Sequence, residues 1–285
     1  LLILLLTTLV QLSHVALSQT CNNIAANDPT VCSSHGFCVA TDTCLCHHGY
    51  NPKTNCLKRN VGHAFSAGDN SKKQLGDPLK ADLSYSYTMM RVGDYMGLMK
   101  LELVSAGEYF ALALNTKGEV FGWGANNYGQ LGRGSTSTFE SIPTIIEGDL
   151  KGKRVVSIAA CAFHALAADE DGKVYAWGTN SATDAFYNQP TSGWLGVTLG
   201  NLAYSYKPKL VLSHPDVYPP MTNVVKVGCG RYFSVVLSSN NRIFAWGGNF
   251  DGQLGIGSSG PASEMAEVTK SQAGSTVKWV DIASG

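Results

Sequence analysis

The chain has 285 residues, including 31 glycines; 44% of the residues are apolar and 15% are charged, which favours short strands and tight turns over long amphipathic helices. Lysine plus arginine and aspartate plus glutamate number 21 each, so the formal net charge is zero. The sequence has no basic stripe to neutralise a row of phosphates and no polybasic or C-terminal lipid-anchor signal, which argues against nucleic-acid binding and lipid anchoring.

Residues 1–18 have the pattern of a secretory signal peptide. Residues 1–10 are apolar apart from two threonines, and small residues at Ala16 and Ser18 suit cleavage before Gln19. A membrane anchor is the alternative, but a spanning helix needs about 20 apolar residues and this run is shorter. The chain begins with leucine and lacks a basic leader. We expect export, which places the protein outside the cell or on its surface.

The next segment, residues 19–57, is rich in cysteine. Six of the eight cysteines lie here: Cys21, Cys32, Cys38, Cys44, Cys46 and Cys56. An even number at this density after an export signal predicts a disulfide framework, because so short a segment cannot be held together by a hydrophobic core alone. The alternative is a zinc site formed with His35, His47 and His48, which an oxidising compartment disfavours because thiols there pair with one another. Spacing alone does not choose among the possible pairings.

The spacing and the intervening residues of this segment resemble an EGF-like domain of the short, tenascin-like variety. The matching pieces are Cys32-Ser-Ser-His-Gly-Phe-Cys38, Cys44-Leu-Cys46 and Cys46-His-His-Gly-Tyr50. The resemblance implies three disulfides, Cys21–Cys38, Cys32–Cys44 and Cys46–Cys56. Calcium-binding modules of this kind carry an acidic cluster before the first cysteine. Here those positions hold Ser18, Gln19 and Thr20, so no calcium site is predicted.

Beyond residue 60 the sequence repeats. Each of three units has two alternating apolar runs joined by a turn of Lys117-Gly118, Asp171-Gly172 or Asn240-Asn241, residues that tolerate the positive φ angles of tight hairpins. The second run ends in a Trp-Gly pair, and a Gly-x-Leu-Gly segment follows it. The pairs are Trp123-Gly124, Trp177-Gly178 and Trp246-Gly247. We interpret these tryptophans as packing residues rather than ligand-stacking residues, because a large buried ring stabilises such sheets.

These units resemble the repeats of the regulator of chromosome condensation (RCC1) family, whose complete form is a seven-bladed β-propeller. The shared marks are Trp-Gly-x-Asn and Gln-Leu-Gly pieces after a Gly-x-x-[His/Phe] strand, and the resemblance covers residues 62–285. Partial copies at residues 67–76 and 280–285 flank the three full units. The resemblance implies an all-β fold: an incomplete β-propeller of RCC1-like blades after a small disulfide-rich EGF-like module. We interpret the chain as a fragment of a longer protein, whose blade count and any downstream membrane anchor are left open.

No enzyme constellation is predicted. Cys161 and His164 lie three residues apart, but His164 occupies the place that Phe110 and Phe233 have in the other units, so we interpret it as a repeat-position side chain rather than a base. Cys161 and Cys229 are expected to be small buried residues, and whether they are free or bonded to each other is left open. The glycines are explained by turns, so no phosphate-binding loop is expected. No cofactor and no metal site are predicted either.

One irregularity points to a contact surface. Asn126 and Gly129 are three residues apart, whereas the equivalent Asn180 and Gly193 are separated by an insertion, and a further long stretch follows at residues 197–220. Long insertions with exposed aromatic side chains often bind partners; the alternative is a variable loop with no role. The aromatic candidates are Phe186, Tyr187, Tyr204 and Tyr206.

The expected function is recognition or adhesion outside the cell or on its surface, with a protein or carbohydrate ligand and no catalysis. The founding member of the resembled family is an exchange factor for a small nuclear GTPase, and that activity is the alternative. The export signal and the disulfide module argue against it, and a shared propeller says little about function, which lies in the loops. A small GTPase is expected as a partner only under the alternative.

Overall fold

The computed structural model describes residues 20–21, 24–25, 36–40, 43–46, 64–92, 100–183, 190–196, 203–212, 220–268 and 279–283. The chain divides into two compact units, Leu1–Asn60 and Val61–Gly285, and each is described by itself. The predicted signal peptide lies outside the described residues, and the side chains that would form the three predicted disulfides of the cysteine-rich segment are not described. Within the described ranges, no helix has the length and apolar character needed to cross a bilayer.

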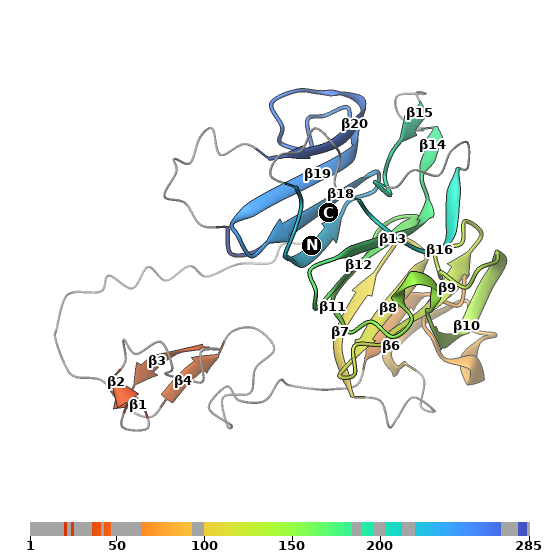
Figure 1. The fold of residues 1–285 in the computed structure, drawn as a ribbon. Coiled ribbons are helices and arrows are strands. Elements are labelled where there is room, and N and C mark those ends of the chain that lie inside the picture. The colour runs from red at the N-terminus through yellow and green to blue at the C-terminus, as the bar shows by residue number, and fades with distance from the viewer. Residues whose placement is uncertain are drawn as a thin grey trace. The chain divides into compact units, whose positions relative to one another are not determined.

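The Leu1–Asn60 unit contains two short antiparallel strand pairs (Figure 1). β1 (Thr20–Cys21) pairs with β2 (Ile24–Ala25), and β3 (Gly36–Ala40) pairs with β4 (Thr43–Cys46). The register of β3 and β4 places the backbones of Cys38 and Cys44 opposite each other. The assignment of this unit to the EGF-like type stays a prediction.

The Val61–Gly285 unit is built from antiparallel sheets of strands, which we call blades. Blade 1 contains β7 (Leu101–Ala106), β8 (Phe110–Asn115), β9 (Val120–Asn126) and β10 (Ser137–Ile145). Blade 2 contains β11 (Val155–Ala160), β12 (His164–Asp169), β13 (Val174–Thr179) and β16 (Tyr204–Leu210). Blade 3 contains β17 (Val224–Cys229), β18 (Phe233–Ser238), β19 (Arg242–Asn249) and β20 (Gly260–Glu267). A half blade of β5 (Phe65–Asp69) and β6 (Tyr85–Arg91) precedes them.

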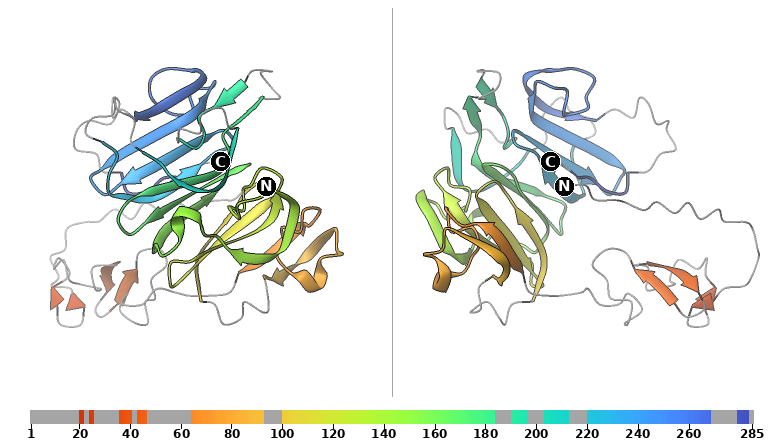
Figure 2. Two further views of the ribbon diagram at one scale, coloured as in Figure 1. Left: turned by 45° about the vertical axis from the view of Figure 1, so that its right-hand side comes forward. Right: turned by 180° about the vertical axis from the view of Figure 1, so that it is seen from behind.

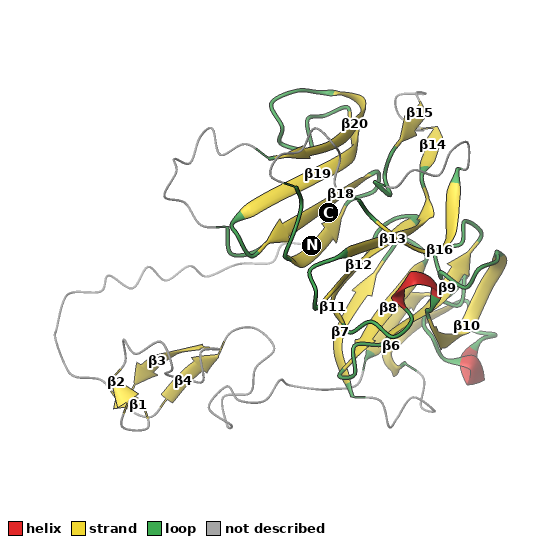
Figure 3. Ribbon diagram, viewed as in Figure 1, coloured by secondary structure: helices red, strands yellow, loops and turns green. Residues whose placement is uncertain are grey.

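The connections contain little regular structure. Two short 3-10 helices, η3 (Pro78–Lys80) and η5 (Gly148–Leu150), are the helical segments of the described ranges (Figure 3). A separate hairpin of β14 (Ser181–Thr183) and β15 (Pro190–Ser192) leaves blade 2 after β13. The part of the chain that the structure describes is therefore built almost wholly from strands and turns, as the composition predicts.

The blades lie side by side, with their first two strands nearest to one another. β11 contacts β7 and β8 of the preceding blade, and β17 contacts β11 and β12. Each blade is a four-stranded sheet. Figure 2 shows the blades following one another in chain order, from yellow through green to blue. The predicted all-β fold is confirmed as a partial propeller of three full blades and an earlier half blade.

Each repeat tryptophan packs against the part of the chain that precedes its own blade. All three rings are buried. The hydrophobic clusters that contain them include residues from that preceding part: Ala64 and Val92 with Trp123, Leu131 and Ile146 with Trp177, and Leu195 and Val211 with Trp246. The tryptophans thus form the core between blades, because each sheet alone would leave one apolar face in water.

The same tryptophans also join neighbouring blades by hydrogen bonds. Trp123 Nε1 donates to the Gln74 carbonyl at 2.8 Å, Trp177 Nε1 to the Gln130 carbonyl at 2.8 Å, and Trp246 Nε1 to the Trp194 carbonyl at 2.9 Å. Every acceptor directly precedes the leucine of a Leu-Gly pair. The Trp-Gly motif of one repeat is therefore hydrogen-bonded to the Leu-Gly segment of the repeat before it. The sequence interpretation of these tryptophans as packing residues did not include this hydrogen bond.

A second repeated hydrogen bond closes the turn that follows the third strand of each full blade and β5 of the half blade. An asparagine Oδ1 accepts from a leucine backbone N–H: Asn70 from Leu75, Asn126 from Leu131, Asn180 from Leu195 and Asn249 from Leu254, at 3.0–3.1 Å. The bond spans five residues in blade 1 and fifteen in blade 2, where the β14–β15 hairpin intervenes. The insertion is thus a hairpin added to an unchanged turn. In the sequence, Phe186 and Tyr187 come between β14 and β15, outside the described residues.

The structure corrects the placement of Tyr204 and Tyr206. Both lie on β16, the outer strand of blade 2, where β16 pairs with β13, and not in an inserted loop. A three-stranded sheet would leave the outer edge of β13 unpaired, and the lysines and proline of this segment, which suit an outer strand, obscure its strand pattern in the sequence. The two tyrosine rings are exposed and stack with their centroids 5.5 Å apart.

Candidate functional site

The turns between the first and second strands of the blades carry an aromatic residue at the same repeat position. These residues are Tyr109, Phe163 and Tyr232, each directly before the first residue of the second strand. Since every blade begins with the same antiparallel hairpin, the three turns lie at the same end of their sheets. The loop after β9, which carries Tyr128, lies at this end too, because the last residues of β9 pair with the first residues of β8.

Side chains from the three blades meet there in a continuous surface, which we call the aromatic band: Tyr128, Phe163, Arg231 and Tyr232. Trp194, which packs against Tyr232, is fully buried and adds no exposed area. The Tyr128 ring packs edge-on against Phe163, with centroids 5.6 Å apart. The Arg231 guanidinium lies 5.9 Å from the Phe163 ring centre and 5.4 Å from that of Tyr232. The Tyr232 ring in turn lies 5.1 Å from that of Trp194. Arg231 therefore bridges the aromatic groups of blades 2 and 3 by cation–π contacts.

The band is partly exposed and carries both charge signs. The Arg231 side chain is 57% exposed and lies 3.8 Å from Glu108 of blade 1, and Tyr128 is 42% exposed. Tyr206 lies against the loop that holds Tyr128, since a Cβ placed on Gly129 would come within 2.5 Å of the Tyr206 ring. Of the four aromatic candidates predicted from the sequence, Tyr204 and Tyr206 thus flank the band.

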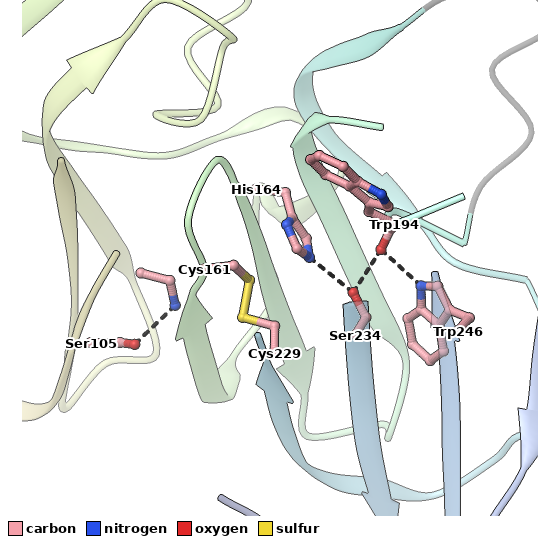
Figure 4. Close-up of a disulfide and its surroundings, with 8 residues drawn as sticks. Ser105, Cys161, His164, Trp194, Cys229, Ser234 and Trp246 are labelled. Carbon is pink, nitrogen blue, oxygen red and sulfur yellow. Dashed lines mark hydrogen bonds between the residues drawn. A yellow bond between two sulfur atoms is a disulfide. The ribbon is translucent and has the colours of Figure 1, made fainter. Parts of the chain in front are cut away.

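A disulfide joins the two turns that carry Phe163 and Arg231. Cys161 and Cys229 are bonded, with their Cα atoms 5.6 Å apart and a sequence separation of 68 (Figure 4). This answers the question that the sequence left open for these two cysteines. Two serines add hydrogen bonds between the first strands: Ala160 N donates to Ser105 Oγ at 2.9 Å and Val227 N to Ser157 Oγ at 3.1 Å. The base of the band is therefore held by covalent and polar contacts.

His164 lies next to this disulfide and is completely buried. Ser234 Oγ donates to the Trp194 carbonyl at 2.6 Å and lies 3.1 Å from His164 Nε2, so the imidazole donates through Nε2–H and its Nδ1 carries a lone pair (Figure 4). Nδ1 has no hydrogen-bond partner among the described residues. Burial lowers the pKa of His164 from 6.5 to about 3, so the imidazole stays neutral near neutral pH. With Cys161 in a disulfide, the two residues do not form a thiolate–imidazolium pair in this state.

Acid is expected to destabilise the propeller unit through His164. The imidazole has a pKa of about 3 in the folded state and of 6.5 in the unfolded chain. Above pH 6.5 both states are neutral and folding carries no penalty from this group. As the pH falls below 6.5, the unfolded chain gains a proton that the folded state does not take up, so stability is lost. The loss is roughly 1.4 kcal/mol per pH unit in that window. Denaturant unfolding should thus show about 2 kcal/mol less stability near pH 5 than near pH 6.5. The His164→Phe variant, which carries the side chain of the other units, should lack this part of the loss; equal losses in both proteins would contradict the assignment.

The band contains residues that were not among the sequence candidates, namely Tyr128, Phe163, Arg231 and Tyr232. A signal was present, because an aromatic residue precedes the Phe/His position in all three repeats. The repeat tryptophans Trp123, Trp177 and Trp246 lie in the cores and not on this surface. Exposed aromatic and arginine side chains of this kind are typical of binding surfaces, since they offer apolar area and directional contacts together.

Comparison with known proteins assigns the repeats. A family model described as "Regulator of chromosome condensation (RCC1) repeat" matches residues 117–168. A second model with the same description matches residues 102–130, 155–182 and 224–253. The structure of Prp20p from Saccharomyces cerevisiae, described together with its binding properties to Gsp1p and histones, is 20% identical, with a TM-score of 0.56 over 74% of this chain and 47% of that one. This likeness supports the fold.

Two curated human proteins are also similar to the chain. The E3 ubiquitin-protein ligase HERC2 is 35% identical over 156 residues, which are 54% of this chain and 3% of that protein. The probable E3 ubiquitin-protein ligase HERC6 is 31% identical over 196 residues, which are 68% of this chain and 17% of that protein. The chain thus spans a small part of the length of these relatives.

Proposed function

Because the Val61–Gly285 unit contains RCC1 repeats folded as blades of a partial propeller, we propose that the protein is a secreted or cell-surface recognition protein that performs no catalysis. Its ligand is a protein or carbohydrate bound at the aromatic band. The observation that carries the proposal is the bridging of three blades by Tyr128, Phe163, Arg231 and Tyr232 at an exposed end of the sheets. The predicted export signal and EGF-like module support the location.

The composition of the band favours a protein ligand over a carbohydrate. Tyrosine and arginine, the residue types of Tyr128, Arg231 and Tyr232, are among those that contribute most to protein–protein affinity. Arg231 contacts two rings and lies beside Glu108, so part of its side-chain freedom is already lost before a ligand binds. The stacked rings of Tyr204 and Tyr206 extend the available apolar area beside the Tyr128 loop.

Removing Arg231 should weaken ligand binding strongly. The exported chain is first tested against arrays of extracellular proteins and of glycans, and the affinity of the ligand found is then measured for variants. We expect Arg231→Ala to raise the dissociation constant about thirtyfold, in line with a loss of about 2 kcal/mol at a central contact residue. Tyr87→Ala is the matched control, because Tyr87 is 89% exposed in the half blade and lies outside the band. Equal losses in both variants, or no loss in Arg231→Ala, would remove the band as the binding site.

The same assays separate this proposal from its alternative, a regulator of a small GTPase. The likeness to Prp20p, whose structure is described with its binding to Gsp1p, motivates that alternative. The exported chain should not accelerate nucleotide release from purified small GTPases and should be found in the culture medium. Retention inside the cell together with accelerated release would replace the recognition proposal by the exchange-factor one.

A further inference from the structure

Three side chains with metal-ligating atoms meet between blades 2 and 3. The sulfurs of Cys161 and Cys229 and a ring nitrogen of His164 lie within 4.8 Å of one another, and all three residues are buried. They come from the β11–β12 turn, the end of β17 and the start of β12, respectively (Figure 4). The blades thus bring together two sulfurs and a nitrogen from separate segments, a set of ligand types that binds soft and borderline cations.

His164 contributes a buried lone pair that the oxidised site leaves unused. Its Nε2–H is engaged by Ser234, and its Nδ1 has no hydrogen-bond partner among the described residues. An acceptor buried in this way is unfavourable. The equivalent positions of the other two units hold Phe110 and Phe233, so packing alone does not require a nitrogen here.

We propose that Cys161, Cys229 and His164 bind a zinc ion when the disulfide between the two cysteines is reduced. A dithiol reductant breaks the S–S bond; it is itself oxidised to a disulfide and supplies the two electrons and two protons that make two thiols. Zn²⁺ then displaces both thiol protons, which are released to solvent, and the two thiolates and the Nδ1 lone pair become its ligands. This inference goes beyond the proposed function and does not depend on it.

The chemistry of the site favours zinc over other cations. Thiolate and imidazole are common zinc ligands, whereas calcium and magnesium prefer oxygen. Two thiolates neutralise Zn²⁺, while Cu⁺ with the same ligands leaves a net negative charge, which a buried site disfavours. With Zn–S of about 2.3 Å and Zn–N of about 2.0 Å, tetrahedral ligand atoms lie roughly 3.5–3.8 Å apart. Side chains already within 4.8 Å of one another can reach this geometry by small shifts.

Ser234 supplies the outer partner that such a site needs. A metal-bound imidazole usually donates its second N–H to a nearby acceptor, which orients the ring and leaves the other nitrogen for the metal. The Ser234 hydroxyl oxygen is in this position, 3.1 Å from His164 Nε2, and its own proton goes to the Trp194 carbonyl. Nδ1 of His164 therefore already carries the lone pair that a metal ligand needs before a metal binds.

The test measures the alkylation rate of each cysteine in the whole chain, with and without Zn²⁺, by peptide mass spectrometry. The chain is first reduced with a dithiol, which is then removed in the absence of air. We expect zinc to slow alkylation of Cys161 and Cys229 about tenfold or more. Because each cysteine is measured separately, the cysteine-rich segment at residues 19–57 does not affect the result. Equal rates with and without zinc overturn the proposal.

Two variants test the role of the imidazole. His164→Phe is expected to form the disulfide when oxidised, yet to lose zinc protection when reduced; protection that persists in it overturns the three-ligand site. Ser234→Ala should weaken zinc binding about 10- to 100-fold, as loss of an outer partner does. Protection by Cu⁺ but not by Zn²⁺ overturns the choice of metal. If the reduced chain loses its near-ultraviolet circular dichroism, zinc should restore it in the parent and not in His164→Phe; failure to restore it in the parent counts against the site.

Discussion

Replacing Trp177 by alanine is expected to lower the free energy of unfolding of the propeller unit by about 3–5 kcal/mol. The Trp177 ring is fully buried and belongs to the same hydrophobic cluster as Leu131 and Ile146 of blade 1. Its Nε1 donates to the Gln130 carbonyl at 2.8 Å. The substitution leaves a cavity and removes the donor of a buried acceptor. Denaturant unfolding followed by circular dichroism measures the change. A loss below about 1 kcal/mol would contradict the role of this residue in joining the blades.

Phenylalanine variants separate ring packing from the hydrogen bond. Trp177→Phe leaves the Gln130 carbonyl without its indole donor, whereas in Trp246→Phe the Trp194 carbonyl still accepts from Ser234 Oγ. We therefore expect Trp177→Phe to be the more destabilising variant, by about 1 kcal/mol. Both rings are fully buried, so the difference in lost area is small. If the two variants are equally stable, the hydrogen bonds add nothing beyond packing.

Removing the Cys161–Cys229 disulfide is expected to destabilise the oxidised protein by about 4 kcal/mol. The bond closes a loop with a sequence separation of 68 residues, and cross-linking a loop of this length restricts the unfolded chain strongly. The Cys161→Ala/Cys229→Ala variant leaves the six cysteines of the cysteine-rich segment in place, so the change in unfolding free energy reports on this bond. A loss of less than about 1 kcal/mol would show that the blades hold together without it.

A serine in the same interface serves as the control for the disulfide. Ser157 Oγ accepts from Val227 N at 3.1 Å, joining the first strands of blades 2 and 3 without a covalent bond. Ser157→Ala is expected to lower stability by about 1 kcal/mol. The double alanine variant should additionally weaken ligand binding, because the turns that hold Phe163 and Arg231 begin at the two cysteines. Ser157→Ala should leave ligand binding largely unchanged.

The local features of the repeats were predictable from the sequence. The hairpin turns contain Gly118, Gly172 and Asn241, and all three adopt positive φ angles of 66–82°. The glycine after each tryptophan does the same: at Gly178, with φ of 98°, a Cβ would lie 2.6 Å from the Phe163 carbonyl oxygen. These are short-range steric requirements, so the residue type itself reports them. The outer strand β16 escaped prediction because its exposed, lysine-containing segment lacks a clear apolar alternation.

By itself the sequence determined the repeat, the strand-and-turn composition and the tight turns, because those depend on residues close together in the chain. The tertiary structure decided which surface could bind and which cysteines could meet. Tyr128, Phe163 and Arg231 come from three blades, and Cys161 and Cys229 occupy positions one step apart in their repeats. Whether such side chains touch depends on the angle and offset between neighbouring sheets, and these follow from how buried side chains such as Trp177 and Trp246 pack between blades.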